Sequence, residues 1–332
     1  MRVLLVRADG IGDALACAPL VAALRAAGHE VGAVLGTRNR AAFAPDAFAR
    51  VHVLERIPWP DHGSTPASRA RAIAEASVVG YDVALVASEE LDAYTFARDA
   101  AIPIRVGFVN ALAKPLKTIV VRPLLTHALA RPASASAARE HEVETLFALG
   151  AGFVDERVPT RDVARLRALV IGEDADYRMD ARRRSRRPAI AIQTSRKHAR
   201  AGLDRDAFVA CARALRARGD EVVVLGDDAA LAYDVARASD ARTDGSLDVG
   251  AWKSRIANAR ALVTGDSGAA HVAGMTGIPT VDAFALGPAT AYDVRRWSPW
   301  AARRRTLVLD PTRPAAHLGR VLVEALDDVL AA

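Results

Sequence analysis

Cysteine and aromatic residues are scarce in this chain, and long hydrophobic runs are absent. The two cysteines, Cys17 and Cys211, lie far apart, so they lack the close spacing of a structural metal site, and we expect buried free thiols in a reducing compartment. Aromatic residues make up 5% of the sequence and are not interleaved with a basic stripe, which argues against a nucleic-acid-binding protein.

No hydrophobic run is long enough to span a membrane. Residues 1–6 are too short for the core of a signal peptide, so we expect a cytoplasmic protein.

Lysine is also rare, although the chain is basic. The lysines are Lys114, Lys117, Lys197 and Lys253, and arginine supplies most of the positive charge behind a net charge of +6 and a pI near 9.7. Heavy use of arginine can reflect genome composition alone. It also suits phosphorylated ligands or an anionic membrane surface, and these are the two partner classes that the charge favours.

The length and the order of the predicted elements indicate two α/β domains. The chain has 332 residues, with 51% hydrophobic and 25% charged residues, which describes a globular protein larger than one usual domain. In the first half the predicted strands are 3–6, 29–35, 51–54, 81–87 and 104–108, and the predicted helices are 13–27, 68–76, 89–100 and 141–149. The stretch from Asn110 to Ala137 is predicted to be irregular.

The alternation restarts after an arginine-rich connector. We expect residues 150–187, which include Arg182–Arg187, to form this polar connector. The strands predicted beyond it are 189–194, 221–225, 261–263, 280–284 and 306–309, and the helices are 206–218, 228–238, 249–258, 268–276 and 317–330. The prediction is two Rossmann-like, doubly wound parallel-sheet domains, residues 1–160 and 161–332, that face each other across a cleft. The last helix is a candidate to pack back on the N-terminal domain.

The most informative segment runs from Val263 to His271. It predicts a buried strand, a Gly/Ser turn and a helix of small residues, and the backbone N–H groups at such a helix start can hold an anion. The alternative is an ordinary junction in which Asp266 or Ser267 caps the helix. Because a strand is restored at Ile278–Phe284, the segment fits a βαβ unit of a nucleotide-binding sheet. His271 could donate to a phosphate or satisfy a core carbonyl.

A second candidate loop follows the first strand. Gly10 and Gly12 permit a tight turn and a close approach to a ligand, and with Asp9 they form the expected acceptor-side loop. The glycine spacing does not match the dinucleotide-binding fingerprint. Asp13 begins the next helix, where it could serve as a cap or, at the carboxyl edge of the sheet, accept a proton from a hydroxyl nucleophile.

Two loops of the second half carry hydroxyl, basic and acidic residues. Thr194, Ser195, Lys197 and Arg200 follow a predicted strand, and hydroxyls followed by cations suit a diphosphate. The alternative is an exposed basic loop. After the next strand, an aspartate of Gly226-Asp227-Asp228 could accept hydrogen bonds from a ribose or cap the following helix.

Together these motifs resemble glycosyltransferase family 9, the lipopolysaccharide heptosyltransferase-like enzymes of the GT-B fold. The resemblance is carried by Arg7-x-Asp9-x-Ile11-Gly12-Asp13, Gly265-Asp266-Ser267-Gly268-x-x-His271, Gly277-Ile278-Pro279-Thr280-Val281, and Phe284 with Gly287-Pro288-x-Thr290. It covers nearly the whole chain. Gly202-Leu203-Asp204 stands where family members usually have a Trp-Pro pair preceded by a lysine, so the choice between Lys197 and Arg200 stays open.

The resemblance implies roles for the candidate residues. It implies Asp13 as the general base, an aspartate such as Asp227 at the ribose, and a donor-binding set made of Thr194, Ser195, Lys197 or Arg200, Asp266, Ser267, Gly268, Ala269 and His271. It implies an inverting transfer without metal or cofactor, from a nucleotide sugar such as ADP-heptose to a lipopolysaccharide-core or other lipid-linked glycan acceptor, with peripheral contact to the inner membrane. The alternatives are a nucleotide-sugar epimerase of similar fold and a non-catalytic nucleotide-sugar-binding protein.

Overall fold

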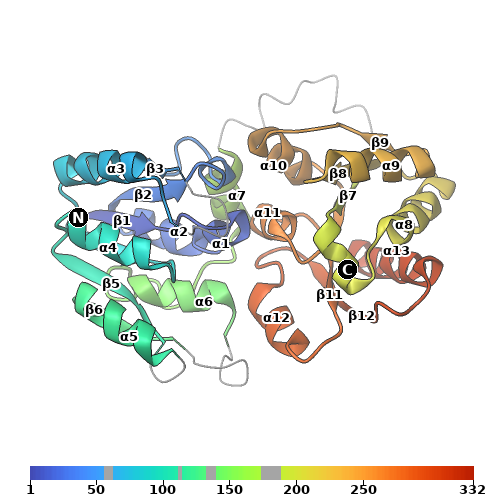
Figure 1. The fold of residues 1–332 in the computed structure, drawn as a ribbon. Helices are drawn as coiled ribbons and strands as arrows, with labels where there is room; N and C mark the ends of the chain where they lie inside the picture. Colours follow the sequence, from blue (N-terminus) through green and yellow to red (C-terminus); the bar gives the residue numbers. More distant parts are fainter. Residues whose placement is uncertain (56–62, 111–113, 132–139, 173–187) are drawn as a thin grey trace. The chain divides into compact units, whose positions relative to one another are not determined.

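The chain divides into two compact units. The computed structural model describes residues 1–55, 63–110, 114–131, 140–172 and 188–332. Within it, Met1–Arg161 form one unit and Asp162–Ala332 the other (Figure 1). Each unit is an α/β structure of its own. The predicted Arg182–Arg187 connector lies outside the described residues.

The first unit is built on a parallel sheet. In its described part, six strands pair in the order β3-β2-β1-β4-β5-β6, and every neighbouring pair is parallel. This is the strand order of a dinucleotide-binding Rossmann sheet. The strands are β1 (Arg2–Val6), β2 (Glu30–Gly36), β3 (Arg50–Leu54), β4 (Val83–Val86), β5 (Ile104–Val109) and β6 (His127–Ala130).

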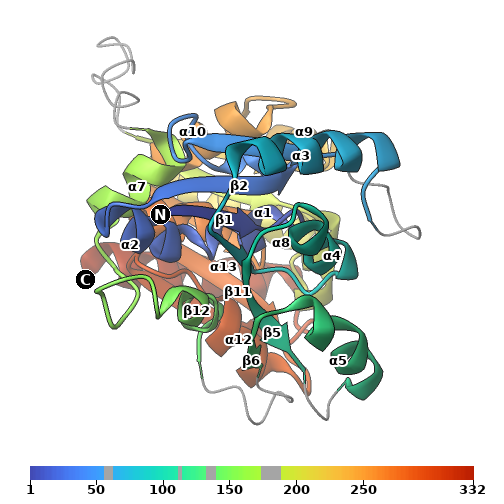
Figure 2. The same ribbon diagram turned by 90° about the vertical axis from the view of Figure 1, so that its left-hand side faces the viewer.

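Helices cover both faces of this sheet. They are α1 (Ile11–Leu15), α2 (Ala18–Ala26), α3 (Pro66–Val79), α4 (Leu91–Asp99), α5 (Pro115–Val121) and α6 (Glu142–Phe147). Successive strand residues point to opposite faces, so Ala84 and Val86 share a core with α3 and α4, whereas Leu85 faces Leu20 of α2 beside Gly150. Figure 2 shows α3 and α4 to one side of the strands and α2 to the other. Both faces are therefore buried, as the continuous apolar strands require.

The second unit repeats the same topology. Over the residues described beyond position 161, its sheet has the order β12-β11-β10-β7-β8-β9, again with parallel neighbours. Numbered from its own first strand, this is the order of the first sheet. The strands are β7 (Ile190–Thr194), β8 (Val222–Gly226), β9 (Arg242–Thr243), β10 (Ala261–Gly265), β11 (Thr280–Ala285) and β12 (Arg304–Leu309).

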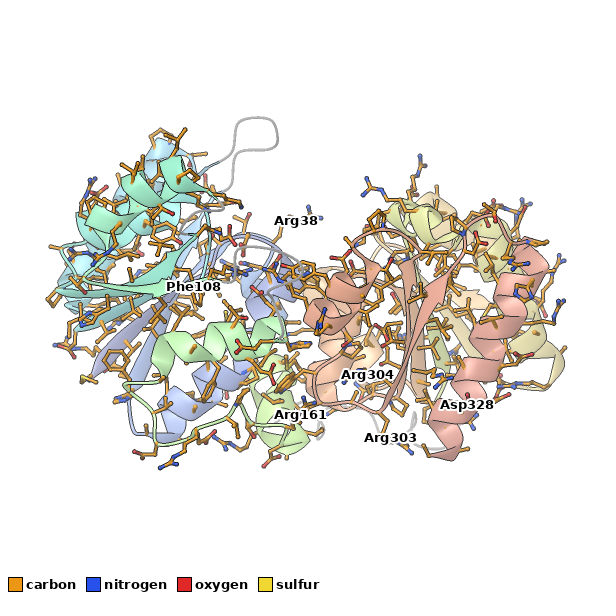
Figure 3. All side chains as sticks on the ribbon, turned by 90° about the horizontal axis from the view of Figure 1, so that it is seen from below. Arg38, Phe108, Arg161, Arg303, Arg304 and Asp328 are labelled. Carbon is orange, nitrogen blue, oxygen red and sulfur yellow. The ribbon has the colours of Figure 1, made fainter. Side chains whose placement is uncertain are left out.

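Its helices also lie on two faces of the sheet. They are α7 (Val163–Ile171), α8 (Arg205–Ala217), α9 (Ala229–Ser239), α10 (Val249–Ala257), α11 (Gly268–Thr276), α12 (Thr290–Trp297) and α13 (Ala315–Ala331). Buried residues of α8, α9 and α13 share one core with Ile190, Ile192 and Val263. The apolar side of α13 thus belongs to the core of this unit, while Asp328 lies on its exposed side (Figure 3).

Several elements differ from those expected. The predicted helix 13–27 is two helices, because Pro19 cannot donate to the preceding turn and instead stands in the first turn of α2. The region 110–137, predicted to be irregular, contains α5 and β6. The connector contains α7, whose N-cap Asp162 accepts hydrogen bonds from Ala164 N and Arg165 N. The helix α12 was not predicted either.

Candidate functional site

Each unit has a point at which its strand order reverses. This point lies between β1 and β4 in the first unit and between β7 and β10 in the second. Val6 is in register with Val86, and Gln193 with Thr264, so the loops that follow each pair of strands begin side by side. Ligands of open parallel sheets bind outside the carboxyl ends of the strands at such a switch point. The segments singled out from the sequence follow these strands.

A buried arginine occupies the switch point of the first unit. Arg7, which directly follows β1, lies with its Nη2 atom 2.7 Å from Asp13 Oδ1 and its Nε atom 2.7 Å from Asp9 Oδ1. Its remaining terminal nitrogen donates to the carbonyl of Ala87, after β4. The arginine side chain is 4% exposed, against 24% for Asp9 and 35% for Asp13. One guanidinium therefore connects two partly buried carboxylates to the neighbouring strand end.

The surroundings set the charges of this group. Burial disfavours the charge on Arg7, but Asp9 and Asp13 hold its pKa above the ordinary value. Burial raises the pKa of Asp9 to about 6, with Arg7 opposing this shift and Asp13 adding to it. Asp9 therefore changes its charge near neutral pH, beside a permanently cationic arginine.

Two neighbours fix the loop that carries the carboxylates. A Cβ atom at residue 10 would overlap Oδ2 of Asp13, so the glycine leaves the space that the carboxylate occupies. The Asn39 side chain donates to the carbonyls of Arg7 and Asp9, at 3.0 and 3.1 Å, and accepts from Gly36 N at 2.7 Å. Asp13 stands in the first turn of α1 and does not cap it.

The expected acceptor-side loop is thus held together by two residues that were not among the predicted site residues. Arg7 was visible in the opening motif but was not assigned a role. Asn39 gave no signal, because the loop carbonyls to which it donates belong to residues 30 or more positions away. The other predicted glycine of the loop, Gly12, is the second residue of α1, and its carbonyl accepts from Ala16 N.

In the second unit, the N-terminus of α11 lies at the switch point, directly after β10. Ser267 occupies the N-cap position, but its side chain makes no capping hydrogen bond. Its hydroxyl lies 2.9 Å from the Thr264 hydroxyl instead. Gly268 and Ala269 begin the helix, and Asp266 is exposed at the turn. The Ser267 side chain therefore does not cap the first backbone N–H groups of α11, which suits an anion at this turn.

His271 lies in the interior of the second unit. It is 4% exposed, and its ring packs edge-to-face on Trp297 of α12 with the centroids 5.9 Å apart. This packing favours a core role, one of the two alternatives above. A ligand contact by His271 stays a prediction.

The ends of β7 and β8 are joined by side-chain hydrogen bonds. Thr194 is fully buried and its hydroxyl donates to the carbonyl of Leu225 at 3.0 Å, so this proton is already used within the sheet. The Ser195 hydroxyl donates to Asp227 Oδ2 at 2.9 Å. Asp228 caps α9 by accepting from Leu231 N. The choice between the two aspartates is thereby resolved: Asp228 is the cap, and Asp227 is exposed beside Ser195.

The basic loop after β7 forms a 3₁₀ helix, η6 (Arg196–Ala201). Lys197 and Arg200 are both exposed on it, and neither has an ion-pair partner among the described residues. Arg196, by contrast, pairs with Asp228. Lys197 and Arg200 are therefore both candidates to bind an anionic ligand at the carboxyl end of β7.

One further residue of this loop was missed. His198 is 3% exposed, and neither of its ring nitrogens has a hydrogen-bond partner in the part of the chain that the structure describes. Burial, with a smaller contribution from Lys197, lowers its pKa to about 4, so the ring is neutral at pH 7. A Cβ atom on Gly265 would lie 2.7 Å from this ring. Glycine at the end of β10 therefore lets the η6 loop pack against the start of the α11 turn.

Metal-binding clusters and membrane-spanning helices are both absent from the described residues. No group of three or more His, Cys, Asp or Glu residues there has the geometry to hold a metal ion. None of the helices described is long and apolar enough to cross a membrane.

The chain matches a known protein family over most of its length. The model of glycosyltransferase family 9 (heptosyltransferase) matches residues 70–322. The chain belongs to glycosyltransferase family 9. It is therefore a glycosyltransferase, and the family recognised from its motifs is confirmed. The match includes the whole switch point of the second unit and begins after the Arg7–Asp13 segment. A search of curated proteins finds no significant match.

Solved structures of family 9 share the fold. ADP-heptose LPS heptosyltransferase II of E. coli superposes with a TM-score of 0.71 at 17% identity, over 100% of this chain and 99% of that chain. E. coli heptosyltransferase WaaC with ADP gives 0.73 at 15%, over 99% and 100%. The family 9 glycosyltransferase of Veillonella parvula DSM 2008 gives 0.72 at 12%, over 99% and 97%. The predicted GT-B fold class of two Rossmann-like units is thereby confirmed.

The fold alone does not identify a transferase. A putative UDP-N-acetylglucosamine 2-epimerase from Listeria monocytogenes is also similar, with a TM-score of 0.56 and 13% identity over 99% of this chain and 90% of that chain. The family match is therefore the finding that separates this glycosyltransferase from the epimerase alternative.

Proposed function

We propose that this glycosyltransferase transfers heptose from ADP-heptose to a hydroxyl of a lipopolysaccharide-core or related lipid-linked glycan. The main support is the difference between its two switch points. The first presents carboxylates tied to an arginine, and the second presents an uncapped helix start, hydroxyls and exposed cations. The first set suits an acceptor hydroxyl, and the second suits a nucleotide diphosphate. Heptosyltransferase II of E. coli, which shares the fold, is named for ADP-heptose.

The proposed reaction is a single displacement that inverts the anomeric carbon. Asp13 removes the proton from the acceptor hydroxyl while that oxygen attacks the carbon and the bond to the diphosphate oxygen breaks. The diphosphate leaves with the electron pair. The start of α11 and Lys197 or Arg200 stabilise the negative charge that develops on it, so no metal ion is required in this scheme. Asp227, held by Ser195, binds the ribose.

The donor assignment is tested by direct binding. ADP-heptose should bind more tightly than UDP- or GDP-sugars in calorimetry, and the affinity should survive EDTA. Tighter binding of a UDP- or GDP-sugar would overturn the assignment of the nucleotide. Donor incubated without acceptor should stay unchanged, since conversion of the sugar would indicate epimerisation. NMR of the product should show an inverted anomeric centre. A retained configuration would exclude single displacement.

The proposed base is tested by replacing Asp13 with Asn. Removing a positioned general base typically lowers turnover by about 10²–10⁴-fold. Donor affinity should change little, because the donor site is assigned to the other unit. Asp46→Asn, an exposed aspartate of the same unit, serves as the control and should behave as the parent. Unchanged turnover of the Asp13→Asn variant would remove Asp13 from this role.

The proposed location follows from the substrates. Nucleotide sugars and lipid-linked acceptors meet at the cytoplasmic face of the inner membrane, so we expect a cytoplasmic enzyme in peripheral contact with that face. Fractionation of cells that express the chain at its natural level tests this expectation.

A further inference from the structure

A short helix of the first unit carries large hydrophobic side chains on its outer surface. Leu116, Ile119 and Val120 of α5 are 79%, 70% and 52% exposed. Residues three and four apart share one side of a helix, so these three form a single surface, here called the α5 face. Val121 is 1% exposed and belongs to the core on the opposite side. The helix is thus anchored by its inner side while its outer side remains apolar and exposed.

This clustering is not repeated elsewhere in the described part of the first unit. The other exposed large hydrophobic residues there are Met1, Val51, Val78, Leu91 and Val158, each on a different segment. Single exposed hydrophobic residues are normal on protein surfaces. A contiguous group indicates an interaction site.

Cations border the α5 face. Lys114 is its N-cap residue, Lys117 lies within the helix and Arg122 follows it. Glu89 accepts from Lys114 at 3.2 Å and from Lys117 at 3.0 Å, and it also contacts Arg131, whose charge is balanced by Glu142. Counted against Glu89, the three cations of the border leave a surplus of two positive charges. The sequence contains no Asp or Glu from residue 100 to residue 139. The surroundings of the face are therefore positive over a long stretch of chain.

We propose that the α5 face docks onto the surface of an anionic phospholipid bilayer. Apolar side chains enter the boundary between headgroups and acyl chains, while the bordering cations contact the negative headgroups. The helix lies on the periphery of its unit, next to β5 and β6 (Figures 1 and 2). With three apolar side chains and two surplus charges, binding is weak and reversible. The proposal rests on the proposed location of the enzyme and names the surface that contacts the membrane. Binding to lipid requires neither donor nor acceptor, so it can be measured without them.

The apolar part is tested by co-sedimentation with vesicles of phosphatidylglycerol and phosphatidylethanolamine. The purified full chain should bind them, and the double variant Leu116→Ser/Ile119→Ser should lower the apparent partition coefficient by about tenfold or more. The matched control is Val78→Ser/Val158→Ser, which removes two residues of the same unit that are 89% and 72% exposed. Absence of binding by the parent chain, or an equal loss in the control, would overturn the proposal.

The charge part is tested by neutralising the border. Lys114→Gln/Arg122→Gln should weaken binding to the anionic vesicles, and high salt should have the same effect. Vesicles of pure phosphatidylcholine carry no net charge. They should bind the parent weakly and should bind this variant equally well. Arg71→Gln/Arg98→Gln, whose side chains are 59% and 53% exposed on the same unit, is the control and should bind normally. Equal binding of parent and border variant to anionic vesicles would contradict the proposed electrostatic contact.

A protein partner for the face is the competing outcome. Sedimentation velocity of the parent and of Leu116→Ser/Ile119→Ser shows whether the face joins two copies of the chain. Self-association that this variant abolishes, with no vesicle binding by the parent, would replace the lipid by a second copy. ADP-heptose binding of each variant should equal that of the parent. Failure of the proposed donor would therefore be seen separately from failure of the membrane contact.

Discussion

Arg7 is the residue on which the acceptor-side loop depends. It is buried, and its guanidinium is shared between Asp9, Asp13 and the Ala87 carbonyl. A lysine keeps the charge but lacks the planar fork that reaches several acceptors at once. We expect Arg7→Lys to fold and to lower kcat at least about tenfold. Arg7 lowers the pKa of Asp9, so weakening this contact should move any acidic limb of the activity profile toward higher pH.

The measurement is kcat from pH 5 to pH 8 together with urea unfolding. Arg105→Lys is the control, because Arg105 also donates to carbonyls, those of Ile102 and Leu124, beside β5 in the same unit. It should lose stability without a change in the pH profile. Arg7→Ala should be worse than Arg7→Lys, since removing one partner of a buried ion pair typically costs about 3–5 kcal/mol. A parent-like profile for Arg7→Lys would show that the arginine only stabilises the fold.

Single residues were predictable where a motif marked them. Asp13 and Asp227 were singled out because each follows a strand; the structure places Asp13 in the first turn of α1 and Asp227 exposed directly after β8. Their proposed roles stay predictions. Arg7, Asn39 and His198 were not assigned, because their importance lies in burial and in contacts with distant segments. The choice between Asp227 and Asp228 also needed coordinates, since either carboxylate could cap α9.

At the scale of elements, the contact between β10 and η6 carries a prediction. A Cβ atom on Gly265 would meet the His198 ring at 2.7 Å, so Gly265→Ala must push the η6 loop away. We expect this variant to lose about 1–3 kcal/mol of unfolding free energy. His198→Ala should leave a cavity and also destabilise. The double variant should lose less unfolding free energy than the sum of the two single losses. In it, the alanine methyl at position 265 occupies space left by the removed His198 ring.

Urea unfolding of the four proteins forms a double-mutant cycle. A coupling of about 1 kcal/mol or more is expected for groups in contact. Additive effects within about 0.3–0.5 kcal/mol would show that the ring and the glycine do not interact. Gly219→Ala is a control for the loss of a glycine alone, although its backbone φ of 85° adds strain of its own.

The elements found from the sequence are those with strong periodicity and clear ends. The buried strands β1, β7 and β10 and the helices α8 and α11 were placed to within a few residues. The break between α1 and α2 was missed because the apolar pattern continues across it and only Pro19 marks it. Both α5 and β6 were missed for a different reason. Exposed hydrophobic residues in α5 do not follow the pattern of a helix on a core, and β6 is defined by pairing with β5.

At the scale of the whole molecule, a buried carboxyl couples the stability of the second unit to pH. Asp282 of β11 is fully buried, with Oδ1 accepting from the Thr306 hydroxyl at 2.8 Å. Burial raises its pKa to about 7, so the folded protein binds this proton more tightly than the unfolded chain does. The stabilisation from this group is complete below the unfolded pKa near 3.8 and is lost as the pH rises to about 7.

Asp282→Asn removes this titration. The stability of the variant relative to the parent should rise between about pH 4 and pH 7, by roughly 1.4 kcal/mol per pH unit at most, and level off above. Trp252, Trp297 and Trp300 belong to the second unit, so tryptophan fluorescence in a Trp59→Phe background reports on it during urea unfolding. Asp293→Asn, on the surface helix α12, should show no such trend. If the difference in unfolding free energy between Asp282→Asn and the parent is constant with pH, the raised pKa of Asp282 is refuted.

The interior position of both thiols has a practical consequence. Cys17 and Cys211 are fully buried, and burial raises the pKa of each to about 12. Thiolates are the species that react with maleimides, so the natural protein should resist such dyes while folded. One cysteine introduced on the surface of each unit could then be labelled without removing the native pair. Energy transfer between two such labels would measure the distance between the labelled sites with and without substrates.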